Sequence, residues 1–218
     1  MTVGSGTAGP NGALGRHRPT GASLAAIILA GLCFGAVMLL HIVRGEIDPL
    51  RRVMSEYANG SHGPVMTVVF YAFGLTSLAL AVRLLRAFER RGAAKLISLL
   101  LALAGLSLIA SGVFEVERPL VPDTLEEVIH SYASISAFVV LISAMLLVSH
   151  ESRRDPRWWT FRWPATALAI GAAAAAAATP LTASTTWSGA VQRALGLAVL
   201  VWFLLTALHV RGKVFRAA

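Results

Sequence analysis

The sequence contains a single cysteine, Cys33, so no disulfide bond can form within the chain. Charged residues are also scarce, because Asp, Glu, Lys and Arg make up 14% of the chain, against about 25% of an ordinary soluble domain. The HExxH spacing of zinc peptidases and the CxxC pair do not occur, and no serine lies in a GxSxG turn. The sequence therefore excludes a disulfide-stapled fold, and no motif marks a catalytic class.

Charge is absent altogether from six stretches, which cover residues 19–43, 57–82, 96–114, 128–150, 163–192 and 194–210. A helix needs about 20 apolar residues to cross a bilayer, with a range of roughly 17 to 25, and each stretch meets this length. The sequence therefore predicts an all-α fold, a six-helix transmembrane bundle. We expect the bundle to occupy residues 21–211, between a disordered cytoplasmic N-terminal segment (1–20) and a basic cytoplasmic tail (212–218).

The distribution of basic residues between these helices predicts the orientation. With the N-terminus inside, 14 of the 19 Lys and Arg residues fall on the inner side, and 8 of the 11 acidic residues fall on the outer side. Cytoplasmic loops carry the Lys and Arg excess, so we expect a multi-pass plasma-membrane protein with both termini in the cytoplasm. The net charge of +8 then reflects topology. We therefore expect the lipid bilayer to be the partner of these basic residues, and we do not expect the protein to bind nucleic acid.

A dense polar segment, 41–63, lies between the first two predicted helices on the outer side. Its Asp48-Pro49 pair is typical of a helix start, because Asp caps a helix and Pro is tolerated at the first helical position. From Leu50 to Tyr57, apolar residues recur at helical spacing. We therefore expect a short amphipathic helix in the membrane interface between helices one and two.

A second polar segment, 115–131, lies between helices three and four on the same predicted side. Asp123-Thr124 is placed to cap a helix that begins at Leu125, with His130 still near the outer surface. Ionisable groups in or beside a membrane are costly and therefore mark candidate sites. We expect the two polar segments to meet and to form an outer pocket.

Arginine side chains suggest what such a pocket binds. Arg44, Arg51 and Arg52 lie in or beside the predicted interfacial helix, and Arg suits two-point contacts with phosphate or carboxylate. The first hypothesis is that the pocket binds a lipid head group or another small polar ligand, with one of these arginines on its anionic part. Arg193, near the outer end of the last helix, is expected to reach the surface or to pair with the outer acids.

Two stretches of the chain resemble a known family. The first is Arg44…Asp48-Pro49-Leu50-Arg51-Arg52…Ser55-Glu56-Tyr57-Ala58…Gly60, followed by an apolar helix with Phe70 and Gly74; the second is Gly112-Val113-Phe114…Pro119…His130-Ser131. Both are similar to stretches of domain-of-unknown-function family 998, which are multi-pass membrane proteins of bacteria and archaea. The resemblance covers most of residues 31–211. It implies six helices in a bacterial-type plasma membrane and no established activity or cofactor.

Together with the arginine argument, the resemblance selects the candidate ligand-binding residues. These are Arg44, Asp48, Arg52, Ser55, Glu56, Tyr57 and His130.

An enzymatic alternative stays open, a membrane-embedded hydrolase or metal-dependent enzyme that uses His41, Glu56 and His130. Histidine and carboxylate side chains suit zinc, although no ligand spacing supports a metal site. Ser55 or Ser131 would be the nucleophile of a hydrolase, but neither lies in a strained turn that would expose it. The sequence thus names neither a reaction nor a cofactor, and it does not indicate the oligomeric state.

Two further interpretations remain. His41 and His130 at the outer end, with His150 and His209 at the inner end, match the residue type that binds haem. Twenty residues of helix, from His130 to His150, span about 30 Å, the whole hydrocarbon thickness, whereas haem ligands are expected deeper. The remaining interpretation is structural, with the outer charges pairing across the two polar segments to hold the rim of the bundle.

Overall fold

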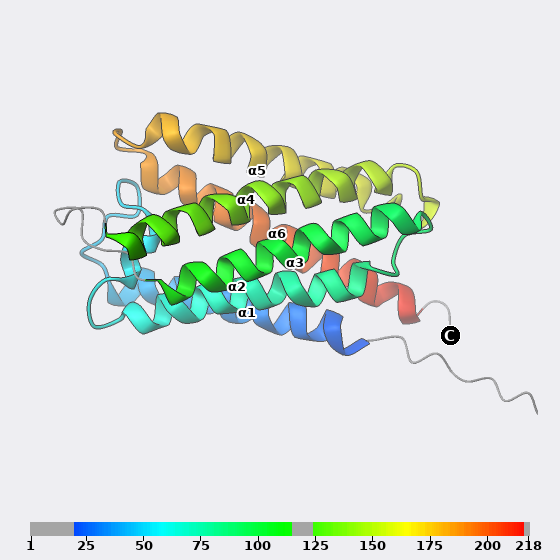
Figure 1. Cartoon of the computed structure of the whole chain (residues 1–218), viewed down its shortest axis with the longest axis horizontal. Coiled ribbons are helices and arrows are strands. Elements are labelled where there is room, and N and C mark those ends of the chain that lie inside the picture. Colours follow the sequence, from blue (N-terminus) through cyan, green and yellow to red (C-terminus); the bar gives the residue numbers. More distant parts are fainter. Residues whose placement is uncertain (1–19, 115–123, 216–218) are drawn as a thin grey trace, which may run out of the picture.

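Six long helices account for most of the chain in the computed structural model, which describes residues 20–114 and 124–215. The helices are α1 (Thr20–Val43), α2 (Gly63–Leu84), α3 (Arg91–Val113), α4 (Leu125–Ser152), α5 (Arg162–Thr182) and α6 (Ser188–Phe215). Figure 1 shows them side by side as rods, with the start of α1 and the end of α6 at the same end of the bundle. No strand occurs within the described ranges, and the predicted all-α fold is confirmed.

All six helices are long and apolar enough to cross a membrane. The shortest, α5, has 21 residues, which correspond to about 32 Å of helix and match a hydrocarbon layer about 30 Å thick. Large apolar side chains such as Ile28, Val82 and Leu99 lie exposed on the outside of the bundle, as expected for a surface that faces lipid. The chain is a multi-pass membrane protein.

The helices pack as a ring. Each helix packs against its neighbour in sequence, α6 packs back against α1, and α2 also contacts α6. The connection between α1 and α2 contains a short 3₁₀ helix, η1 (Met54–Ala58). We call the end of the bundle that holds this connection the η1 end.

Glycine allows α2 and α3 to approach closely. A Cβ atom at Gly74 would lie 2.6 Å from the carbonyl oxygen of Gly105, and one at Gly105 would lie 2.7 Å from the carbonyl oxygen of Gly74. Both distances are too short for any side chain. Ser77 and Ser98 donate hydrogen bonds of 2.7 Å to carbonyl oxygens of the facing helix. Small residues and cross-helix hydrogen bonds thus hold this pair together, as is usual in membranes.

The short helix expected between helices one and two is η1, and it begins at Met54 instead of Leu50. Asp48 delays the start by turning the chain, because its Oδ1 accepts a hydrogen bond from the Leu50 N–H at 2.9 Å. The Asp48 carbonyl also accepts from the Arg52 N–H at 2.9 Å. Tyr57 of η1 is fully buried, so this helix packs onto the bundle through its apolar side.

A cluster of aromatic rings closes the opposite end of the bundle. Trp158, which is 1% exposed, stacks on Phe88 with 4.5 Å between ring centroids and contacts His209 at 4.7 Å. Beside the cluster, Arg90 donates a 2.9 Å hydrogen bond to the buried carboxylate of Glu151. This end is therefore packed and carries its buried acid in an ion pair.

Some sequence predictions fall outside the described residues. Residues 1–19 include nearly all of the predicted disordered segment, and residues 115–123 include most of the polar stretch before α4. The predicted basic tail, 212–218, begins within α6, which continues to Phe215.

Candidate functional site

The first turn of α6 docks onto the α1–α2 connection. The Ala190 N–H donates to the Leu50 carbonyl at 3.1 Å, and the Ser188 hydroxyl donates to the Arg51 carbonyl. A Cβ atom at Gly189 would lie 2.4 Å from the Arg52 carbonyl oxygen, so only glycine fits at this contact. These contacts fix the α1–α2 connection relative to α6.

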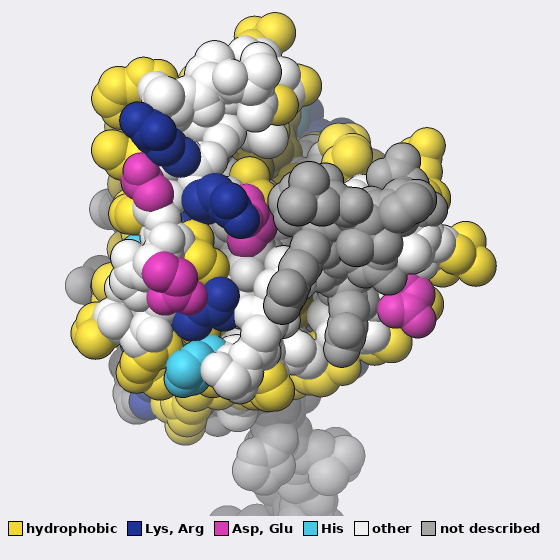
Figure 2. Space-filling view, turned by 90° about the vertical axis from the view of Figure 1, so that its left-hand side faces the viewer, with side chains coloured by type: hydrophobic (Ala, Val, Ile, Leu, Met, Phe, Trp, Pro, Cys, Tyr) yellow, Lys and Arg dark blue, Asp and Glu magenta, His cyan; other side chains and the backbone are white. Residues whose placement is uncertain are grey.

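Ion pairs cover the surface of the η1 end. Figure 2, which looks onto this end, shows basic and acidic side chains lying next to one another. The pairs are Arg44–Glu46, Arg51–Asp48 and Arg52–Glu56. The hydrogen bond from Arg44 lowers the pKa of the Glu46 carboxyl. Each of these arginines is therefore already matched by an acid of the same connection.

Two of these pairs also hold the backbone in place. Arg44 Nη1 donates to the carbonyl of Asn59 and, at 3.5 Å, to that of Tyr57, which ties the end of α1 to the end of η1. Glu56 Oε1 accepts a 3.2 Å hydrogen bond from the N–H of Val53 and so caps the start of η1. Arg44 and Glu56 therefore act on the shape of the connection.

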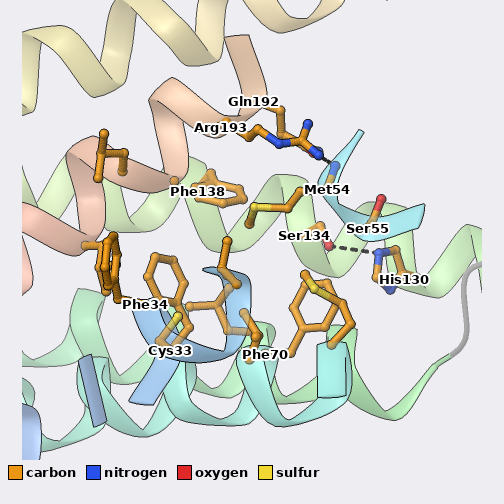
Figure 3. A pocket seen from close by; sticks show the side chains of 18 of the residues that line it. Cys33, Phe34, Met54, Ser55, Phe70, His130, Ser134, Phe138, Gln192 and Arg193 are labelled. Atoms are coloured by element: carbon orange, nitrogen blue, oxygen red, sulfur yellow. Dashed lines mark hydrogen bonds between the residues drawn. The ribbon is translucent and has the colours of Figure 1, made fainter. Parts of the chain in front are cut away.

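A cavity of about 390 Å³ lies beneath η1, among α1, α2, α4 and α6. This volume is in the range of about 300–1,000 Å³ that is usual for small-molecule sites. Its body is apolar, and its wall there includes Phe34, Met38, Phe70, Phe73, Phe138 and Leu200. Figure 3 shows Phe34 and Phe138 toward one side of the cavity and Ser55 and His130 toward the other.

One side of the cavity is open. Ile135 of α4 and Leu197 of α6 both line it, and their side chains are 62% and 54% exposed. The cavity therefore opens on a surface of the bundle that faces lipid. A hydrophobic molecule would reach the apolar body from the bilayer through this opening.

Arg193 is the charged residue at the polar end of the cavity. Its Nη1 donates to the carbonyls of Pro49 and Arg52 at 2.8 and 2.7 Å. Its Nη2 donates to the Tyr57 hydroxyl at 3.2 Å, and its Nε donates to His41 Nε2 at 3.0 Å. The guanidinium is therefore held rigidly in place by the connection and by α1.

The hydrogen bonds of His41 fix its protonation. Its Nδ1 lies 2.7 Å from the Val37 carbonyl oxygen, which can only accept, so Nδ1 carries a hydrogen. Its Nε2 accepts from Arg193, which can only donate. His41 is thus a neutral imidazole with both nitrogens in use.

Among the described residues, nothing balances the charge of Arg193. Within residues 20–114 and 124–215, no carboxylate forms an ion pair with it, and its partners are carbonyls, a phenol and a neutral imidazole. No acidic side chain lines the cavity. Coulomb attraction therefore favours an anion beside this guanidinium.

A second polar cluster lies on α4 and α3. His130, which is 6% exposed, has its Nδ1 2.8 Å from the Ser111 carbonyl oxygen and 3.2 Å from that of Phe114. Nδ1 must therefore carry a hydrogen, and in the neutral ring Nε2 then has a lone pair. Ser134 Oγ lies 3.5 Å from this Nε2 and 3.0 Å from Ser111 Oγ. Figure 3 shows the contact between His130 and Ser134 as a dashed line.

The structure brings only some of the sequence-selected residues to the cavity. Ser55 and His130 line it, and Tyr57 reaches it indirectly through its hydroxyl contact with Arg193. The others lie in the α1–α2 connection outside the cavity wall; these are Arg44, Asp48, Arg52 and Glu56.

The polar cavity residues absent from the sequence-selected binding set include Gln192, Arg193 and Ser134. The sequence left two alternatives for Arg193, and among the described residues it has no acidic partner. The spacing in the sequence could have predicted that Ser134 lies beside His130, because residues four apart share a helix face. No sequence pattern predicts the position of Gln192, because the partner of its Oε1, the Met54 N–H, is far away in sequence.

A metal-dependent enzyme would need a set of metal ligands. In the described part of the chain, no three His, Cys, Asp or Glu residues are grouped closely enough to hold a metal ion. His41 is occupied on both nitrogens. Glu56 is engaged by Arg52 and the Val53 N–H.

Comparison with known families agrees with this architecture. The model of the family described as "Protein of unknown function (DUF998)" matches residues 27–209. The chain belongs to this family. The match runs from α1 to α6 and includes the α1–α2 connection and every residue of the cavity wall. The resemblance seen in the sequence is thereby confirmed. No curated protein and no solved structure matches the chain.

Proposed function

We propose that this member of the DUF998 family binds an amphiphile that carries an anionic head group, in the cavity beneath η1. The observation that carries the proposal is the positive charge of Arg193 at the polar end of an otherwise apolar cavity, a charge that no acid among residues 20–114 and 124–215 pairs with. Arginine suits phosphate and carboxylate groups. One of its five N–H groups, on Nη2, has no partner among the described residues and is available to a ligand.

The shape of the cavity supports an amphiphile over a small polar ligand. Its apolar body, with Phe34, Phe70 and Phe138, suits an alkyl chain, whereas Ser55 and Gln192 add hydrogen-bonding groups near Arg193. The opening on the lipid-facing surface gives a route from the bilayer. A membrane lipid or a fatty acid has both parts in the required order.

This assignment replaces the sequence-based hypothesis that Arg44, Arg51 or Arg52 meets the anion. All three have acidic partners in the α1–α2 connection, and none lines the cavity. In the proposal Arg44 shapes the connection that positions Arg193, because it donates to the carbonyls of Tyr57 and Asn59.

The excess of Lys and Arg on the side of the termini supports a plasma-membrane protein with both termini in the cytoplasm. In this orientation the η1 end and the polar end of the cavity face the exterior. The anionic head group would then lie at the level of the outer leaflet.

Dodecyl phosphate and dodecanol distinguish an anionic site from a merely apolar one. With the protein in nanodiscs of diether phosphatidylcholine, we expect dodecyl phosphate to stabilise the fold by about 2.7 kcal/mol at a hundredfold excess over Kd. Dodecanol, which lacks the charge, should stabilise it much less. Thermal unfolding followed by tryptophan fluorescence measures both.

Arg52→Gln is the matched control, because it removes a cation of the same end that is paired with Glu56 outside the cavity. It should leave the difference between the two probes unchanged. Equal stabilisation of the wild-type protein by dodecyl phosphate and dodecanol would contradict the proposal.

A further inference from the structure

Ser134 and His130 form a nucleophile and base pair inside the cavity. They lie one helical turn apart on α4, both line the cavity, and Ser134 Oγ is 3.5 Å from His130 Nε2. The contact is longer than the usual 2.6–3.2 Å of a catalytic pair, but such contacts are often looser before substrate binds. Rotation of the Ser134 hydroxyl hydrogen from Ser111 to His130 requires no movement of heavy atoms.

His130 is oriented for the role of general base. The carbonyls of Ser111 and Phe114 both accept from its Nδ1, which leaves the lone pair on Nε2 facing Ser134. Phe70 packs edge-on against the ring at 5.4 Å and restricts its rotation. The two carbonyls thus do what the acid of a catalytic triad does, in that they fix the tautomer and stabilise the imidazolium.

Ser111 positions the nucleophile from the other side. Its hydroxyl donates to the Ser107 carbonyl at 2.9 Å and accepts from Ser134 at 3.0 Å. Ser111 is buried, so this contact is shielded from water. Ser134 is thereby held between Ser111 and His130 and is turned toward the cavity.

We propose that the cavity is also an active site, in which Ser134 and His130 cleave a carboxylic ester that joins an acyl chain to a phosphate-bearing head group. This inference rests on the proposed function, because Arg193 would bind the phosphate and the apolar body would hold the acyl chain. Ser134 lines the same cavity as Arg193 and the apolar side chains (Figure 3). The ester carbonyl of such an amphiphile lies between its head group and its chain.

The reaction proceeds in two acyl transfers. Ser134 Oγ adds to the ester carbonyl carbon while its proton moves to His130 Nε2. The bond from this carbon to the head-group oxygen then breaks, and His130 returns the proton to that oxygen. Water from the η1 end attacks the acylated Ser134, again through His130, which releases a fatty acid and restores the serine.

The oxyanion formed in each step needs donors that the helix backbone of α4 does not offer, because its N–H groups are used within the helix. Ser55 and Gln192 line the same cavity. The Oε1 of Gln192 is held by the Met54 N–H, which leaves its amide N–H groups to donate. These two side chains are the donors that the geometry offers.

A long-chain alkyl fluorophosphonate tests the pair directly, because it phosphonylates an activated serine, forming a bond from Oγ to phosphorus with loss of fluoride. With the wild-type protein in diether nanodiscs, we expect a covalent adduct that peptide mass spectrometry maps to Ser134. Ser134→Ala should give no adduct, and His130→Gln should slow labelling by about 100-fold or more. Ser143→Ala removes an exposed hydroxyl of the same helix, which donates to the Val139 carbonyl, and it should label like wild type.

The mapping uses the wild-type protein, so it does not depend on the folding of a variant. No adduct, or an adduct on another serine, overturns the proposed catalysis. If dodecyl phosphate still stabilises the protein in that case, the binding function stands without the reaction. If Ser134 is labelled but dodecyl phosphate has no effect beyond that of dodecanol, the active site stands and the head-group assignment to Arg193 fails.

Discussion

Replacing Arg193 by glutamine is expected to abolish the preference for dodecyl phosphate over dodecanol and to weaken dodecyl phosphate binding roughly thirtyfold, or about 2 kcal/mol. The loss follows because Arg193 supplies the charge at the cavity's polar end. The same change removes hydrogen bonds to the Pro49 and Arg52 carbonyls and to His41. We therefore also expect a loss of about 2–4 kcal/mol in the free energy of unfolding. Probe titrations and detergent-induced unfolding measure the two effects.

Arg193→Lys separates these two contributions. Lysine keeps the charge, but its single ammonium group cannot reach the carbonyls, His41 and Tyr57 together. The lysine variant should therefore lose most of the same stability and retain a preference for the anionic probe. If the glutamine variant bound dodecyl phosphate as tightly as wild type, Arg193 would have only a structural role.

Replacing Trp158 by alanine is expected to lower the free energy of unfolding by about 3–5 kcal/mol, the usual cost of removing a buried tryptophan. The ring stacks on Phe88 and contacts Phe161 and His209, so its loss leaves a void at the end of the bundle away from η1. Binding of dodecyl phosphate to the folded fraction should not change.

Trp163→Ala serves as the comparison, because this ring belongs to the same segment and is 65% exposed. Its loss should cost about 1 kcal/mol or less, including the contact with Arg162. A similar cost for both substitutions would show that the aromatic cluster does not hold this end together.

The spans were predictable from the sequence because a membrane helix needs no information from distant residues. An uncharged stretch of sufficient length is enough to predict a span. The start of α4 was also predictable from its capping residue, Thr124, whose Oγ1 accepts from the Glu127 N–H at 3.3 Å. The start of α3 was less clear. It begins at Arg91 instead of Leu96, because basic residues can continue a helix beyond the apolar layer.

In the loop 151–163, composition alone does not predict which aromatic rings are buried. Its Trp and Arg content is typical of an anchor at the level of the lipid head groups. In the structure Trp159 and Trp163 are exposed as an anchor requires, but Trp158 and Phe161 are buried in the bundle. Which rings turn inward depends on the 3₁₀ turn at Pro156–Trp158, and the periodicity of the sequence does not reveal that turn.

The site was only partly predictable, because its residues meet across long distances in sequence. His41 and Arg193 are 152 positions apart, and nothing local indicates that the arginine binds a neutral imidazole instead of an acid. Conversely, the dense charges of segment 41–63 draw attention to Arg44 and Arg52, which pair locally. Local charge density thus draws attention to the end of the bundle that holds the cavity, whereas the residue that we propose to meet the ligand, Arg193, lies outside the charged segment.

The central claim is that an anionic amphiphile occupies the cavity, and Gly196 offers a way to fill the cavity without touching its polar groups. Gly196 lines the cavity, and a Cβ atom there would meet only the end of Met54 at 3.7 Å, an ordinary contact. Gly196→Leu would therefore project into the space for the alkyl chain. Gly171→Leu adds the same side chain on α5, where a Cβ atom has nothing within 4 Å.

Native mass spectrometry of protein extracted from its own membrane measures occupancy directly. We predict one bound anionic amphiphile per chain in the wild-type protein and in Gly171→Leu, and none in Gly196→Leu. Equal occupancy in Gly196→Leu and wild type, or bound molecules that are all uncharged, would contradict the account.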